Sequence, residues 1–107
     1  MIFGKGYDHN FVLNANDGKS PVVEVVEKNT GRKMEVFTTQ PGVQFYTGNF
    51  LNGSEKGRGV SYLHRTGFCL ETPQFPDVQN QPNFPSTVLK PGETWKSKTT
   101  YKFSVVK

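Results

Sequence analysis

The sequence predicts an all-β, antiparallel fold. Residues 21–28 and 33–39 are rich in β-branched side chains, and the four residues between them, Asn-Thr-Gly-Arg, favour a turn, which is typical of a β-hairpin. Residues 95–106 alternate between apolar and polar side chains, as expected for a strand with one packed and one solvated face. No stretch keeps the apolar periodicity of an amphipathic helix.

The remaining elements follow from short apolar runs separated by turn-forming residues. The hairpin strand at 33–39 places Met34, Val36 and Thr38 on one face and Lys33 and Glu35 on the other. The other strands are expected at residues 11–13, 43–48 and 68–72, with a short irregular or extended segment at 60–65. The loops are expected at residues 14–19, 52–59 and 73–92.

Length and composition restrict the classes of protein. A chain of 107 residues fits at most one domain, and an apolar share of 34% allows only a thin core, which nine Phe and four Tyr help to build. The net charge is +4, but the lysines of the last strand alternate with aromatic residues and form its solvated face. We therefore expect no nucleic-acid binding. No segment has transmembrane length and no signal peptide is recognisable, so we expect no membrane association and a cytoplasmic location.

The single cysteine is consistent with a reducing compartment, because it excludes an internal disulfide. Cys69 has apolar neighbours in sequence and is expected to be a small core residue. His64, beside Arg65, is interpreted as a surface or loop residue rather than a catalytic acid.

Two acidic residues stand at strand boundaries. Glu71 ends an apolar strand, and the loop that follows contains five prolines, which is more typical of a binding or active-site loop than of a plain connection. A general base would suit that place, although a solvated acid at a strand end is the simpler alternative. Asp8, with His9 and Asn10, lies where a turn becomes a strand; such side chains commonly bond the local backbone, and their spacing is not that of a metal site.

Four motifs, in this order, resemble the C-terminal part of the galactose mutarotase (aldose 1-epimerase) family. They cover residues 6–11 (Gly-Tyr-Asp-His-Asn-Phe), 40–49 (Gln-Pro-Gly-Val-Gln-Phe-Tyr-Thr-Gly-Asn), 69–72 (Cys-Leu-Glu-Thr) with 75–77 (Phe-Pro-Asp), and 83–86 (Asn-Phe-Pro-Ser) with 91–93 (Pro-Gly-Glu). Each motif is short, but four in register make the resemblance specific, and it spans almost the whole chain.

The resemblance implies a fold and a reaction. The family's fold is a large antiparallel β-sandwich, called a supersandwich, and the family interconverts the α and β anomers of aldohexoses such as galactose and glucose by acid/base ring opening. The family's general base, the glutamate of its Leu-Glu-Thr motif, maps onto Glu71. Its substrate-binding aspartate maps onto Asp8, where it would accept a hydrogen bond from a sugar hydroxyl. No metal and no organic cofactor are implied.

The departures from the family are equally informative. The family's general acid is a histidine, and a second histidine and an arginine also contact the sugar; all three belong to an N-terminal portion without counterpart here. Neither His9 nor His64 lies in those motifs, and Pro73-Gln74 replaces the Gln-His that often follows the glutamate. Residues 1–107 are therefore expected to form a partial domain that self-associates, pairs with an N-terminal fragment or is only partly ordered. Whether such a chain is active alone stays open, and the alternatives are a non-catalytic sugar-binding or regulatory module and a structural remnant without a ligand.

Overall fold

The computed structural model describes residues 5–107 and confirms the all-β, antiparallel prediction. The first four residues, part of the segment in which no signal peptide was recognised, lie outside the described part. The elements are β1 (Asp8–Val12), β2 (Val23–Val26), β3 (Arg32–Thr38), β4 (Gly42–Tyr46), β5 (Lys56–Gly57), β6 (Val60–Ser61), β7 (Cys69–Glu71), the 3₁₀-helix Val78–Asn80 and β8 (Thr99–Val105). Within residues 5–107, no helix is long and apolar enough to cross a membrane.

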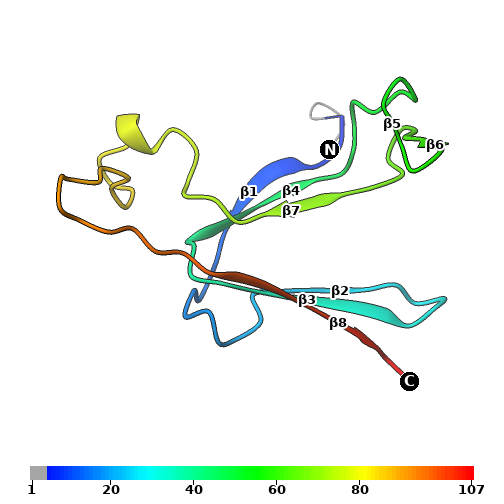
Figure 1. Ribbon diagram of the computed structural model, residues 1–107, viewed down its shortest axis with the longest axis horizontal. Coiled ribbons are helices and arrows are strands. Elements are labelled where there is room, and N and C mark those ends of the chain that lie inside the picture. The colour runs from blue at the N-terminus through cyan, green and yellow to red at the C-terminus, as the bar shows by residue number, and fades with distance from the viewer. Residues whose placement is uncertain (1–4) are drawn as a thin grey trace.

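Two three-stranded sheets form the body of the molecule. The first sheet has the strand order β1-β4-β7 and the second β2-β3-β8, while β5 and β6 form a separate two-stranded ribbon. The two sheets approach each other where β3 leads into β4, and they diverge toward the opposite end (Figure 1). The chain crosses between the sheets at this end three times, from β1 to β2, from β3 to β4 and from β7 to β8, and the β3–β4 connection is the shortest of the three.

The hairpin prediction is confirmed. Strands β2 and β3 pair antiparallel with Val26 opposite Lys33, and the turn between them has Gly31 at a φ of 71°, a conformation that glycine adopts without steric cost. The Glu27 carboxylate accepts hydrogen bonds from the backbone N–H groups of Asn29 and Thr30, both at 2.8 Å. The turn is therefore held by a side chain as well as by the backbone ladder.

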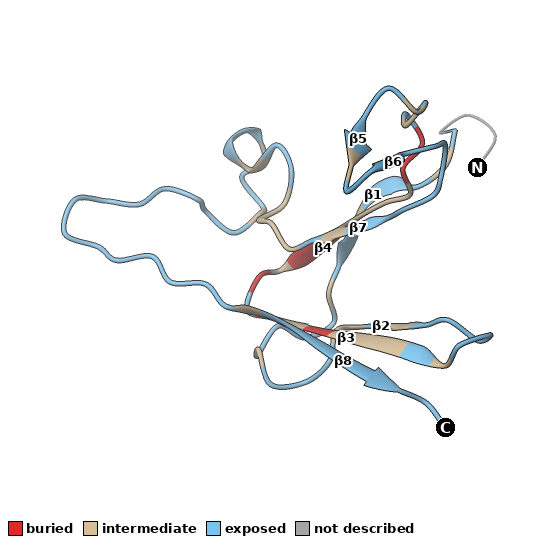
Figure 2. Ribbon diagram, turned by 45° about the vertical axis from the view of Figure 1, so that its right-hand side comes forward, coloured by how far each residue is buried: buried red, intermediate tan, exposed pale blue. Residues whose placement is uncertain are grey.

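The packed face predicted for β3 is also confirmed. Val36 and Thr38 are fully buried, and on the opposite face Lys33 forms ion pairs with Glu24 at 2.6 Å and with Glu35 at 3.6 Å. Burial is concentrated along β3, the β3–β4 connection and the start of β4 (Figure 2). The core is thin, as the composition indicated, and it lies where the sheets converge.

Three boundaries differ from the prediction. The last strand begins at Thr99 rather than at residue 95, because β3 ends at Thr38, the partner of Thr99, and residues before Thr99 have no ladder to join. The expected exposed loop at 52–59 contains β5, which pairs with β6. The polar residues from Asp8 onward already belong to β1 rather than to a turn.

Candidate functional site

Asp8 and Glu71 lie on the same face of the first sheet. In the β1–β4–β7 register, Asn10 faces Gln44 and Gln44 faces Glu71, while Asp8 faces Tyr46 in the adjacent row. Directly paired residues point to the same side of a sheet, as do residues two apart on one strand. We call this side the carboxylate face; it carries Asp8, Asn10, Gln44, Tyr46, Cys69 and Glu71.

Gln44 is the central residue of this face. Its Nε2 donates a hydrogen bond of 2.8 Å to Asp8 Oδ1, and its position on β4 is directly opposite Glu71 on β7. The sequence identified the two acidic residues but not this amide. The available signal was a polar residue between Val43 and Phe45 in an otherwise apolar strand.

Glu71 ends β7, as predicted, but the strand is less buried than an apolar run suggests. Only Leu70 is half-buried, and Glu71 is exposed. The expectation that Cys69 is a core residue is wrong: its thiol is exposed. The reason is its pairing with Tyr46, which places Cys69 on the carboxylate face rather than between the sheets.

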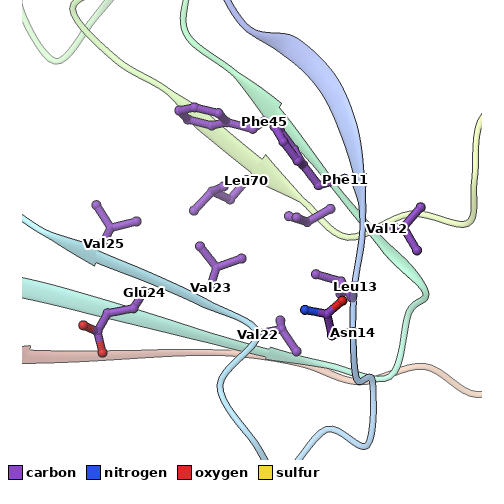
Figure 3. A pocket seen from close by; sticks show the side chains of 11 residues that line it. Phe11, Val12, Leu13, Asn14, Val22, Val23, Glu24, Val25, Phe45 and Leu70 are labelled. Atoms are coloured by element: carbon purple, nitrogen blue, oxygen red, sulfur yellow. The ribbon is translucent and has the colours of Figure 1, made fainter.

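The opposite side of the first sheet is apolar and faces the second sheet. Phe11, Phe45 and Leu70 point toward Val23 and Val25 of β2 around a cavity of about 410 Å³ (Figure 3). The alternation of the strands puts this cavity on the side away from Asp8 and Glu71. It is therefore separate from the candidate site.

Neither histidine is placed to act beside Glu71 in the described structure. His9 follows Asp8 on β1, so its ring lies on the apolar side, with its centroid 5.8 Å from that of Tyr7. His64 is exposed in the loop between β6 and β7. The loop position of His64 agrees with the sequence-based interpretation of it as a surface or loop residue.

A buried amide holds the chain that leads into Asp8. Asn49 is only 8% exposed; its Nδ2 donates to the carbonyl oxygen of Tyr7 at 2.7 Å, and its Oδ1 accepts from Thr47 Oγ1 at 2.8 Å and from Arg65 Nε at 3.3 Å. A Cβ at Gly6 would overlap the Asn49 side chain, and Gly6 has a φ of 128°. The glycine of the Gly-Tyr-Asp motif is thus required by this close approach.

The proline-containing loop rests on the carboxylate face at Gly42. The ring of Phe75 and the Oδ1 atom of Asn10 both approach the point where a Cβ of Gly42 would stand, at 3.1 Å and 2.5 Å respectively. The Phe75 ring also packs edge-on against Phe84, with 5.2 Å between centroids. The side-chain amides of Asn80 and Gln81 lower the pKa of Asp77 in the same loop. The Phe75 contact holds the loop against the start of β4, the strand that pairs with β7.

Within residues 5–107, no three His, Cys, Asp or Glu side chains gather closely enough to hold a metal ion. The carboxylate face offers the carboxylates of Asp8 and Glu71 and the amides of Asn10 and Gln44, which are groups suited to hydrogen bonding with hydroxyls and, for the carboxylates, to proton transfer.

Comparison with known proteins decides the family. A sequence profile described as aldose 1-epimerase matches residues 2–102, nearly the whole chain. The chain belongs to the aldose 1-epimerase family. It is 54% identical to galactose mutarotase of Bos taurus and 52% identical to that of Homo sapiens, in each case over 101 residues that make up 94% of this chain and 30% of the relative. It is also 40% identical over 102 residues to aldose 1-epimerase of Escherichia coli (strain K12), covering 92% of this chain and 30% of that protein.

The family resemblance inferred from the four motifs is thus confirmed, and the matched span includes both Asp8 and Glu71. This member of the aldose 1-epimerase family spans about 30% of the length of these curated relatives.

Proposed function

We propose that this chain carries the base-bearing part of an aldose 1-epimerase that interconverts the α and β anomers of aldohexoses such as galactose and glucose. The observation that carries the proposal is that Asp8 and Glu71, the two residues expected from the family motifs, share one sheet face around Gln44. A pyranose ring bound on this face would contact both carboxylates.

Each residue then has a defined role. The exposed Glu71 carboxylate removes the proton of the C1 hydroxyl, while an acid protonates the ring oxygen and the bond between C1 and that oxygen breaks. Rotation about the C1–C2 bond and reclosure on the other face of the aldehyde, with both protons returned, give the second anomer. Asp8 accepts a hydrogen bond from a sugar hydroxyl, and the amide of Gln44 keeps its carboxylate oriented.

We propose that the general acid is not supplied by His9 or His64. His9 lies on the opposite side of the sheet from Glu71, and the chain spans about 30% of its relatives. We therefore propose that residues 1–107 form the C-terminal part of a larger sandwich domain, and that an N-terminal portion supplies the acid and covers the apolar side of the first sheet. We also propose that the chain acts in the cytoplasm, in carbohydrate metabolism.

A second candidate is a non-catalytic sugar-binding or regulatory module. The position of His9 on the other side of the sheet from Glu71 favours this binding module. Asp8, Gln44 and Glu71 can bind hydroxyls even where no proton donor lies opposite the base. The two functions differ in one measurable respect, since a binding module retains galactose affinity without accelerating anomer exchange.

Polarimetry on freshly dissolved α-D-galactose tests the proposal. We expect the purified chain, alone or combined with an N-terminal portion from a relative, to accelerate mutarotation, and Glu71→Gln to abolish the acceleration. Glu55→Gln, at an exposed loop position, is the matched control and should retain it. Saturable galactose binding that Asp8→Ala weakens, with a rate equal to buffer in both preparations, would favour the binding module; absence of both rate and binding would contradict both functions.

A further inference from the structure

Strand β8 of the second sheet contacts the chain on both sides of Glu71, although it is not in the same sheet as β7. Before Glu71, the hydroxyl of Tyr101 donates a hydrogen bond of 2.8 Å to the carbonyl oxygen of Leu70. After Glu71, the Oγ1 atoms of Thr72 and Thr99 lie 2.7 Å apart. The two bonds join the end of β7 to the start of β8, at the end where the ribbons of the two sheets converge (Figure 1).

The contact through Thr99 is anchored in the core. Thr99 Oγ1 also bonds to Thr38 Oγ1 at 3.0 Å, and Thr38 is fully buried and accepts a further hydrogen bond from the backbone N–H of Gln40 at 3.1 Å. A hydroxyl can donate one hydrogen bond and accept others, so the chain Thr38–Thr99–Thr72 is chemically consistent. Thr72 is therefore linked through Thr99 to Thr38, in the most buried part of β3.

The direction of the side chains matters for function. Leu70 lines the apolar cavity and Thr72 bonds to β8, so both side chains point toward the second sheet, whereas Glu71 between them points to the carboxylate face. Contacts to the two flanking residues hold the backbone of Glu71 without touching its carboxylate. The short strand β7, which pairs with only one neighbour in its sheet, needs such support at its end.

We propose that Tyr101 and Thr99 are positioning residues for Glu71: through the Leu70 carbonyl and the Thr72 hydroxyl they fix the backbone from which the base projects. The proposal rests on the function proposed above for its catalytic consequence, since a base must be held close to its productive geometry. Its structural part, the restraint of residues 70–72 by β8, stands without that function.

Two kinds of measurement on the full chain test the proposal. Amide hydrogen exchange reports the restraint itself: we expect Thr99→Val and Tyr101→Phe to raise exchange within residues 70–72 about three- to tenfold, the change expected for loss of one ordinary hydrogen bond. The separate variant Thr99→Ser, which keeps the hydroxyl, should exchange the amides of residues 70–72 as slowly as the parent chain does. Thr100→Val, one residue along β8 and on its other side, is the control and should leave residues 70–72 unchanged.

Mutarotation kinetics report the catalytic consequence. In a preparation that accelerates mutarotation, we expect Thr99→Val and Tyr101→Phe to lower kcat about three- to tenfold with little change in KM, because Asp8 on β1 is not touched. Thr99→Ser should again restore the rate. An unchanged kcat despite faster exchange would overturn the positioning role.

The two proposals fail in different ways. Exchange at residues 70–72 that is the same in Thr99→Val, Tyr101→Phe and the parent chain would overturn the positioning proposal, whatever the activity. Absence of both mutarotation and galactose binding in the parent chain, alone and combined with an N-terminal portion from a relative, would contradict the proposed function, and the exchange measurement would then decide the restraint by itself.

Discussion

Gln44 donates its side-chain amide to Asp8 at 2.8 Å and stands directly opposite Glu71 across the β4–β7 pair. Gln44 thus lies between two acidic residues that are far apart in the sequence. It orients the side chain of Asp8, the proposed acceptor for a sugar hydroxyl, and lies between Asp8 and Glu71 on the carboxylate face.

The first prediction concerns this amide. Gln44→Leu removes the hydrogen bond to an ionised group but keeps a side chain of similar size, so we expect galactose binding to weaken about three- to tenfold at this exposed site. Isothermal titration calorimetry with galactose measures the change. Gln79→Leu, in the exposed 3₁₀-helix, is the control. Equal affinity of Gln44→Leu and the parent chain would show that the bond has no role in binding.

The second prediction concerns the close approach at Gly42. A Cβ there would stand 2.5 Å from Asn10 Oδ1 and 3.1 Å from the Phe75 ring, so Gly42→Ala forces the proline-containing loop and β1 apart. We expect the free energy of unfolding of Gly42→Ala to be about 1–3 kcal/mol lower than that of the parent chain, which is the usual cost of overpacking. Urea denaturation followed by fluorescence measures it. Gly67→Ala is the matched control, because a Cβ at Gly67 meets nothing within 4 Å.

The third prediction is a pH dependence of the β2–β3 turn. Hydrogen bonds from the Thr30 hydroxyl and from the backbone N–H groups of Asn29 and Thr30 lower the pKa of Glu27 from 4.5 to about 2. A group whose pKa is lowered on folding contributes stability above its unfolded pKa and loses it as the pH falls through the folded value. We expect Glu27→Gln to unfold at lower urea concentration than the parent chain at pH 7, and the difference to shrink between pH 4.5 and about 2.

That difference is read from urea midpoints at a series of pH values. Glu55→Gln, at an exposed loop position, provides the control for a general effect of removing one acid. A difference between Glu27→Gln and the parent chain that stays constant down to pH 2 would contradict the assignment.

The fourth prediction uses Cys69 as a chemical probe of the carboxylate face. Its exposed thiol is two residues before Glu71 on the same side of β7. Alkylation with iodoacetamide adds a group beside the site, and we expect it to reduce galactose binding at least about tenfold by obstruction. Cys69→Ser should bind galactose normally and be insensitive to the reagent. Full binding by the alkylated parent chain would place the sugar elsewhere.

The fifth prediction concerns self-association. Phe103 is 73% exposed on β8, an edge strand of the second sheet, and the apolar cavity between the sheets is open. Exposed apolar edges of this kind promote association. We expect light scattering after size-exclusion chromatography to show a mass that rises with concentration, and Phe103→Lys to reduce it. Val88→Lys, at a loop residue with 75% exposure, should have less effect, and a concentration-independent monomer would contradict the prediction.

Local sequence determined a large part of this protein. The β-branched runs around Asn-Thr-Gly-Arg specify the β2–β3 hairpin, because turn type and alternation act over a few residues. Alternation also assigned Val36 and Thr38 to the packed face of β3. The motifs containing Asp8 and Glu71 indicated the family, which the matched profile confirmed.

Only the tertiary structure decided which residues meet. Alternation relates side chains within one strand, but it cannot say that β4 lies between β1 and β7, and that order places Asp8, Gln44 and Glu71 on one face. The same long-range pairing turned Cys69 outward and His9 away from Glu71. The contacts of Thr99 and Tyr101 around Glu71 join different sheets, so they depend on how the sheets pack, which no local pattern encodes.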